Sequence, residues 1–246
     1  MKQLVCISRT PDTTSQISFV EDSTKFDTDG VQYIMNPYDE WYALVKALEV
    51  KEQVGGTVTV INVGDGSSDQ IIRKALAIGA DDAIRVDKVA ADAGDVAMQI
   101  ASVAKTEAYD VIYTGKETID YNNSEVGSRI AAHLDLPFIS YANTLSVEES
   151  TFTIARDIEG GSEVVSVQAP FVLSASKGLA EQRIPNMRGI MMAKRKPLVV
   201  KEAVAYEATS KIVEFEKPEG RTSCTMIDPD NMGELVRLLH EEAKVI

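Results

Sequence analysis

Short apolar runs without polar alternation recur through the first part of the chain, and amphipathic segments separate them. Apolar runs of this kind are typical of strands buried on both faces of a sheet. They cover residues 2–8, 57–63, 83–86, 109–115 and 137–140. Hydrophobic residues at helical spacing predict helices between them, over residues 36–52, 69–78, 92–105 and 124–134. This alternation calls for a parallel sheet that helices cover on both faces.

The helix predicted over 36–52 carries the clearest start signals. Asn36 can cap it, and Pro37 suits the first helical position. Asp39 and Glu40 complement the positive end of the helix dipole. We therefore expect this helix to begin at Asn36.

Polar and apolar residues alternate in the second half of the chain, which predicts an antiparallel extension of the sheet. Its expected strands are residues 145–150, 151–160 and 162–176. Residues 177–197 are basic and Met-rich, and we expect them to be irregular. Smaller features complete the pattern: a surface hairpin within 9–32, a strand over 211–217 and a last amphipathic helix over 229–245. The fold class is thus α/β, with a doubly wound, mostly parallel sheet, an antiparallel extension and a C-terminal arm.

Charge and cysteine usage narrow the classes of function. The 246 residues carry a formal net charge of -13, which argues against nucleic-acid binding because that requires a basic face. The two cysteines, Cys6 and Cys224, lie far apart without metal-ligand spacing, so a reducing compartment fits. The first apolar run is too short for a signal core or a membrane span. We expect a cytoplasmic protein without stable membrane insertion.

A phosphate-binding helix start is the main candidate site. The strand 109–115 leads through a polar loop into the helix at Ser124, whose first N–H groups have no helical acceptor. Gly127 is costly in a first turn unless something approaches the backbone closely. The alternative is a helix that Ser124 caps without any ligand. The other strand ends, at residues 6–8 and 63–66, are expected at the same edge of the sheet, as is the turn 36–39.

Catalytic patterns are scarce. The loop 64–69 is too short for a dinucleotide fingerprint, and neither His133 nor His240 has a nucleophile or metal-ligand pattern beside it. We therefore expect no catalytic residue and no metal site.

The Met-rich segment predicts a contact surface. Met187, Met191 and Met192 lie among arginines and lysines in an otherwise acidic chain. Methionine adapts to varied partners, and exposed cations steer an acidic one. The alternative is an amphipathic helix that packs back on the sheet.

Five stretches, in this order and spacing, resemble the β subunit of electron transfer flavoprotein. They are residues 36–40 (NPYDE), 73–86 (RKALAIGADDAIRV), 110–120 (DVIYTGKETID), 156–161 (RDIEGG) and 179–197 (LAEQRIPNMRGIMMAKRKP). The resemblance covers the chain from the first strand to about Leu198. It implies an adenine nucleotide alpha hydrolase-like fold, with a nucleotide-binding domain over 1–198 and an arm over 199–246 that packs on an α subunit.

The resemblance also implies cofactors and partners. The β subunit forms a heterodimer with an α subunit, and an FAD is shared between them. The heterodimer exchanges electrons with acyl-CoA or other flavin dehydrogenases, and the β subunit has no catalysis of its own. The β subunit holds AMP or a second FAD. The implied nucleotide positions are Cys6, Asn36, Pro37, Tyr38, Asp39, Val63, Asp120, Asn122, Asn123, Ser124, Glu125, Val126, Gly127, Ser128 and Ala131. The implied partner-recognition positions are Arg183, Met187, Ile190 and Met191, with Met187 as the apolar anchor.

Two positions depart from the family pattern. Glu125 stands where the family usually has Gln, and Val126 stands where AMP-binding members have Thr. A carboxylate beside a phosphate repels it unless it pairs with a cation. The choice between AMP and a second FAD in the β subunit therefore stays open. A stand-alone adenine-nucleotide sensor of the same fold is the alternative function, although such a sensor has no need of the basic Met-rich segment.

Overall fold

The computed structural model describes residues 1–117, 123–220 and 223–246. They form two compact units, the first made of residues 1–18 and 27–213 and the second of residues 19–26 and 214–246. The first unit contains the central sheet and its helices. No helix among the described residues is long and apolar enough to cross a membrane.

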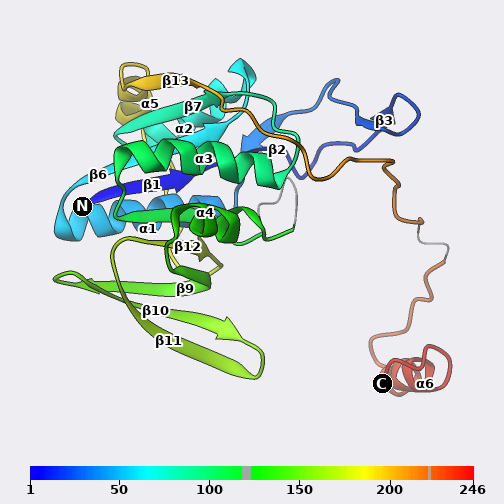
Figure 1. Ribbon diagram of the computed structural model, residues 1–246. Helices are drawn as coiled ribbons and strands as arrows, with labels where there is room; N and C mark the ends of the chain where they lie inside the picture. The colour runs from blue at the N-terminus through cyan, green and yellow to red at the C-terminus, as the bar shows by residue number, and fades with distance from the viewer. Residues whose placement is uncertain (118–122, 221–222) are drawn as a thin grey trace. The chain divides into compact units, whose positions relative to one another are not determined.

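A nine-stranded sheet forms the centre of the first unit (Figure 1). Its strand order is β11-β10-β9-β12-β8-β1-β6-β7-β13. The parallel part consists of β1 (Lys2–Cys6), β6 (Thr57–Val63), β7 (Asp82–Asp87), β8 (Val111–Gly115), β12 (Phe171–Ala175) and β13 (Leu198–Glu202). The antiparallel extension consists of β9 (Phe138–Glu148), β10 (Thr151–Ile158) and β11 (Gly161–Gln168). The predicted mostly parallel sheet with an antiparallel extension is confirmed.

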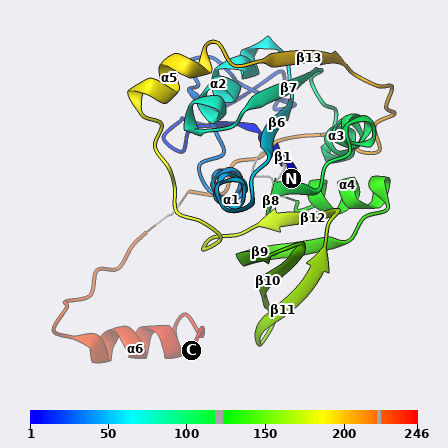
Figure 2. The ribbon, with the colours of Figure 1, turned by 90° about the vertical axis from the view of Figure 1, so that its left-hand side faces the viewer.

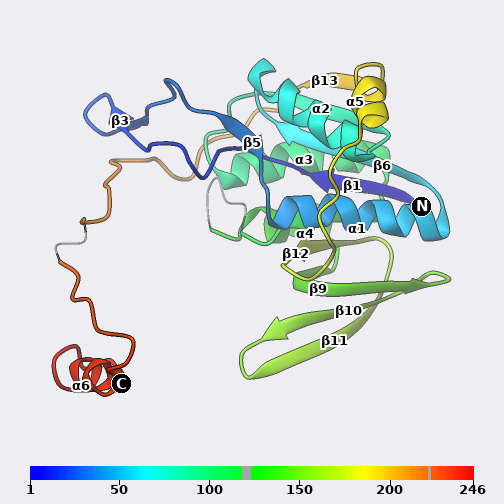
Figure 3. The ribbon, with the colours of Figure 1, turned by 180° about the vertical axis from the view of Figure 1, so that it is seen from behind.

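Helices cover both faces of the sheet, as the apolar strands require. One face carries α1 (Asp39–Val54) and α2 (Asp69–Ile78), and the other carries α3 (Ala93–Glu107) and α4 (Val126–Leu134). Figure 2 shows the two helix layers on opposite sides of the sheet, and Figure 3 shows the α1 and α2 side from behind. Each layer has its own apolar core against the central strands.

The run predicted as one strand over 162–176 is two strands with different directions. It divides at Ala169-Pro170 into β11, which is antiparallel to β10, and β12, which is parallel to β8. All five residues of β12 are buried, because it lies between β8 and β9 inside the sheet. The separate strands expected over 137–140 and 145–150 are, conversely, the single strand β9.

Other expectations also need correction. The segment expected to be irregular contains the short helix α5 (Met187–Ala193), and β13 is a strand that we did not predict. The strand predicted over 211–217 is absent among the described residues of that stretch. Helix α1 begins at Asp39, since Asn36 accepts from the Tyr38 N–H at 3.0 Å and caps a turn before the helix instead.

The remaining elements are small and belong to both units. In the first unit, β2 (Arg9–Pro11) pairs with β5 (Tyr33–Met35), and the 3-10 helix η1 (Gly66–Ser68) precedes α2. The second unit contains the predicted hairpin, formed by β3 (Phe19–Val20) and β4 (Lys25–Phe26), and the helix α6 (Met232–Glu241). Phe215 stacks on Phe19 with ring centroids 5.0 Å apart.

Candidate functional site: a cleft at the carboxyl ends of the parallel strands

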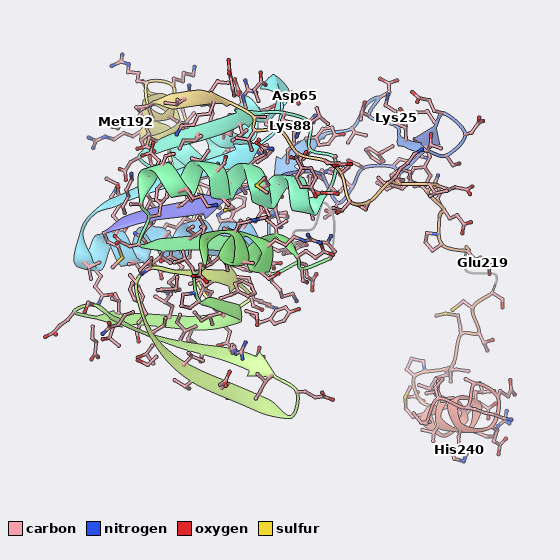
Figure 4. All side chains as sticks on the ribbon, viewed as in Figure 1. Lys25, Asp65, Lys88, Met192, Glu219 and His240 are labelled. Atoms are coloured by element: carbon pink, nitrogen blue, oxygen red, sulfur yellow. The ribbon has the colours of Figure 1, made fainter. Side chains whose placement is uncertain are left out.

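A cleft of about 310 Å³ opens at the carboxyl ends of β1, β6 and β8. The chain order reverses at β1, which has β6 on one side and β8 on the other, so the cleft occupies a topological switch point. Figure 4 labels Asp65 and Lys88 at this end of the sheet. The lining residues are Cys6, Ile7, Ser8, Arg9, Glu40, Asn62, Val63, Gly64, Asp65, Ser68, Lys88, Val89, Ala90, Val96, Ile100, Thr114, Gly115 and Val126.

Glu40 fixes the backbone at the end of β1. Its buried carboxylate accepts a hydrogen bond from the Ser8 N–H and another, at 2.8 Å, from the Ser8 hydroxyl. Burial, reinforced by the neighbouring Glu40 carboxylate, raises the pKa of the Cys6 thiol far above its usual range. Cys6 therefore stays a neutral wall of the cleft and is not a nucleophile.

Two cations lie at the cleft. The Lys88 ammonium pairs with the fully buried Asp95 carboxylate at 2.9 Å. Burial opposes ionisation of Asp95, but hydrogen bonds from Lys88, Gln99 and the Ala91 N–H outweigh it and lower the pKa of the carboxyl. The Arg9 guanidinium stacks on the Tyr33 ring, 3.4 Å from its centroid. Both side chains are thus held in place: Asp95 balances the charge of Lys88, whereas the Arg9 guanidinium favours an anionic ligand.

The end of β6 is rigid. The Asn62 amide donates to the Ile7 carbonyl at 2.9 Å and so ties β6 to the end of β1. A side chain at Gly64 would meet Ser68 and Asn62, which leaves room only for glycine. The cleft therefore has a preformed wall on this side.

The start of α4 lacks a side-chain cap from its N-cap residue. That residue is Glu125 rather than the expected Ser124, and its carboxylate binds Arg129 instead, at 2.7 and 2.8 Å. The negative charge at Glu125 is thereby compensated. The N-terminal partial charge of α4 remains available for an anion.

Gly127 is required for a reason other than the one inferred from the sequence. A Cβ atom there would lie 2.6 Å from the Thr114 hydroxyl oxygen and 2.9 Å from the Phe138 ring. The close approach is therefore helix-to-strand packing within this chain, which places the first turn of α4 directly against β8.

The predicted nucleotide residues are distributed unevenly. Cys6, Val63 and Val126 line the cleft. Asp39 lies beside Gly115 at its edge, and its carboxylate accepts from the Glu117 N–H at 3.3 Å. Asp120 and Asn122 lie outside the described residues. The remaining predicted positions are not in the cleft lining but in the turn before α1 or at the start and middle of α4: Asn36, Pro37, Tyr38, Asn123, Ser124, Glu125, Gly127, Ser128 and Ala131.

Sequence reasoning missed several polar residues of the cleft, chiefly Glu40, Asn62 and Lys88. Asn62 lies at the end of the predicted strand 57–63 and Lys88 lies two residues after the predicted strand 83–86, and that position is the signal that could have identified them.

The second candidate site is the segment 182–196, here called the docking segment. Its C-terminal part is fixed to α2, since the Arg73 guanidinium donates to the Ala193 and Lys196 carbonyls at 2.8 and 2.7 Å. Its apolar side chains nevertheless face away from the protein: Ile184 is 87%, Met187 75% and Met191 69% exposed. The backbone packs back on the body while the side chains stay free. Ile184, which we did not single out from the sequence, is the most exposed of them.

Arg183 differs from the expectation of a free cation. Its guanidinium forms two hydrogen bonds with the Glu52 carboxylate, at 2.6 and 2.9 Å. The charge of Arg183 is thus partly neutralised, and the side chain fixes the docking segment to α1.

A metal-binding cluster does not emerge from the part of the chain that the structure describes. It contains no group of three or more His, Cys, Asp or Glu residues that could hold a metal ion. The cleft and the docking segment are the two features that the following proposal uses.

Comparisons with known proteins agree with one another. The model of the electron transfer flavoprotein domain matches residues 23–206. The electron transfer flavoprotein subunit beta of Bacillus subtilis (strain 168) is 33% identical over 263 aligned positions that cover both chains completely. The subunit of the same name from Bos taurus is 31% identical over 255 positions, covering 100% of this chain and 99% of the relative. The caffeyl-CoA reductase-Etf complex subunit CarD of Acetobacterium woodii is 32% identical over 205 positions, 81% of this chain and 78% of the relative.

Proposed function

The chain belongs to the electron transfer flavoprotein family as a β subunit, and from that premise we propose that it has two binding functions. The cleft holds an adenine nucleotide, and the docking segment receives partner dehydrogenases. The FAD that the heterodimer carries, held with the α subunit, supplies the electron-carrying chemistry when bound. This chain supplies binding and positioning without catalysis of its own, in the cytoplasm, where its two free thiols fit a reducing compartment.

The cleft fits a mononucleotide. Its volume of about 310 Å³ is at the lower end of the range of ligand pockets, roughly 300–1,000 Å³. Apolar residues such as Val63 and Ile100 can contact a base, and the start of α4 with Lys88 can hold a phosphate. We therefore propose AMP rather than a second FAD in this chain.

Counting released nucleotides tests the proposal. The chain is purified with its α subunit, the nucleotides are released with acid, and FAD and AMP are quantified per heterodimer. One FAD with one AMP is the expected result. Two FAD molecules without AMP would show that this chain binds a second flavin instead of AMP. One FAD without any further nucleotide would contradict nucleotide binding in the cleft.

The Glu125–Arg129 pair gives a prediction about affinity. We expect Arg129→Gln to weaken AMP binding roughly threefold to tenfold, because Glu125 would then carry an uncompensated charge beside the phosphate. The double variant Glu125→Gln/Arg129→Gln is expected to restore wild-type affinity. Isothermal titration of nucleotide-depleted heterodimer measures both. Equal affinities for the wild type and Arg129→Gln would show that Glu125 lies too far from the phosphate.

The exposed side chains of the docking segment give a second prediction. Ile184→Ala and Met187→Ala are each expected to raise the KM of a partner dehydrogenase for the heterodimer roughly fivefold to fiftyfold, since buried apolar anchors dominate interfaces. The FAD content is expected to stay unchanged. Val164→Ala, which removes an exposed apolar side chain from β11, serves as the matched control. An unchanged KM in both variants would contradict the docking role.

The region 199–246 is proposed to bind the α subunit. In its last helix, α6, no residue is buried, and Met232 and Val236 are about half exposed. An amphipathic helix with an uncovered apolar face needs a partner surface.

A further inference from the structure

Trp41, the single tryptophan of the chain, lies in the first turn of α1 and contacts the docking segment. Its side chain is buried, at 8% exposure, and its indole N–H donates to the Arg183 carbonyl at 3.2 Å. The Lys74 ammonium of α2 lies 4.5 Å from the ring centroid and helps to hold the ring. The indole therefore joins α1 to the backbone of the docking segment.

Two further contacts fix the same stretch of backbone. The Gln182 amide donates to the Pro37 carbonyl, and the Arg183 guanidinium binds Glu52 on α1. Figure 3 shows the connection from β12 to α5 running across α1. The beginning of the docking segment is thus fixed at three points, one at Pro37 in the turn before α1 and two on α1 itself, at Trp41 and Glu52.

Ile184 follows directly after these contacts. One peptide bond separates its Cα atom from the carbonyl that Trp41 binds, yet its side chain is 87% exposed. A fixed backbone that carries a free apolar side chain loses little conformational entropy when a partner binds.

We infer that Trp41 is a positioning residue for partner docking: its indole N–H holds the Arg183 carbonyl so that Ile184 is presented in a preformed position. This inference rests on the proposed docking function. The ring alone provides packing, whereas the N–H provides the position of the backbone. Removing the N–H while an aromatic ring stays at this position, and separately removing the neighbouring Gln182 tether while Trp41 stays intact, therefore separate the two roles.

The test uses the complete heterodimer and an acyl-CoA dehydrogenase with its acyl-CoA substrate as the probe. Trp41→Phe removes the indole N–H, and Gln182→Leu removes the neighbouring tether from an exposed position. Lys74→Met is the control, because it changes the surroundings of the ring and leaves the N–H in place. The KM and kcat for reduction of the heterodimer are measured together with dithionite reduction, FAD content and thermal unfolding.

We expect Trp41→Phe and Gln182→Leu each to raise the KM roughly threefold to tenfold, the effect of losing one hydrogen bond. The kcat, dithionite reduction and FAD content should not change, and Lys74→Met should match the wild type. The positioning role would be overturned if the KM stayed unchanged in Trp41→Phe and Gln182→Leu. It would also be overturned if these variants lost as much activity in dithionite reduction as in reduction by the dehydrogenase. If Ile184→Ala also leaves the KM unchanged, or if the dehydrogenase fails to reduce the wild type, the proposed docking function fails instead.

Discussion

Replacing Asp92 with alanine is expected to lower the free energy of unfolding by about 3–4 kcal/mol, the sum of a lost helix cap and several orphaned donors. Asp92 is the N-cap of α3 and accepts from the Asp95 N–H at 2.8 Å. Its other carboxylate oxygen accepts from the N–H groups of Thr209 and Ser210 at 3.0 and 3.3 Å. A single buried carboxylate thus caps a helix and holds the chain as it leaves the sheet. Chemical denaturation measures the loss.

The contribution of Asp92 should depend on pH in a defined direction. Burial alone raises the pKa of this carboxyl, but hydrogen bonds from Asp95, Tyr206, Thr209 and Ser210 outweigh burial and hold the pKa well below its usual range. A lowered pKa in the folded state means that the stabilisation is complete above the unfolded value of about 3.9 and is lost as the pH falls toward the folded value. The difference between wild type and Asp92→Ala should therefore be constant near neutrality and shrink below about pH 4.

Asp12 provides the control for this prediction. Its carboxylate also accepts hydrogen bonds, from the Thr14 N–H and hydroxyl at 2.9 and 2.7 Å, but within one exposed turn. Asp12→Ala is therefore expected to lower the free energy of unfolding far less than Asp92→Ala does. Limited proteolysis provides a second measurement, since Asp92→Ala should open cleavage near residues 203–213 and Asp12→Ala should not. Equal stabilities of the Asp92→Ala and Asp12→Ala proteins would contradict this role.

Gly189→Ala is expected to raise the KM of a partner dehydrogenase roughly tenfold to a hundredfold, because an ångström-scale misplacement of a binding element has effects of that size. Alanine favours a helix by about 1 kcal/mol over glycine, so helix propensity alone predicts a more stable α5. The added Cβ atom would, however, collide with the Ala77 carbonyl of α2. A backbone oxygen cannot move aside cheaply, so α5 has to shift and carry Met187 and Met191 with it.

The matched control is Gly233→Ala in α6, where an added Cβ atom meets no atom within 4 Å. It should leave the KM unchanged and stability equal or slightly higher. Hydrogen exchange reports the shift directly, because amides of α5 should exchange faster in Gly189→Ala than in the wild type. If Gly189→Ala had the same amide exchange rates and the same KM as the wild type, α2 would have moved to accommodate the added methyl group, and the expected shift of α5 would be contradicted.

The parallel sheet could be predicted because its signal is local. Each central strand, such as 57–63, is an apolar run whose residues are buried on both faces, and the strand recurs in the structure with the same bounds. The helices between the strands carry their pattern in every turn, so their ends shifted by only a few residues. The place of the cleft followed from this alternation, since the loops after parallel strands meet at one edge. The family resemblance also depended on contiguous motifs, and the comparisons confirm it.

The remaining features depend on residues far apart in the sequence. The direction of β12 is set by its neighbours β8 and β9, and β13 becomes a strand only because β7 offers it an open edge. Nothing near Gly127 in sequence reveals that Thr114 and Phe138 occupy the space beside it. The compensation of Glu125 depends on side-chain rotamers, which a pattern of residue types does not specify.

The docking segment shows the same division. Its composition by itself determined that a basic, Met-rich surface exists, because charge and polarisability belong to the residues. Only the tertiary structure decided that Ile184 is its most exposed apolar side chain and that Trp41 and Glu52 hold Arg183. The physical reason is that exposure and tethering are properties of contacts between segments more than 100 residues apart, and no local pattern encodes such contacts.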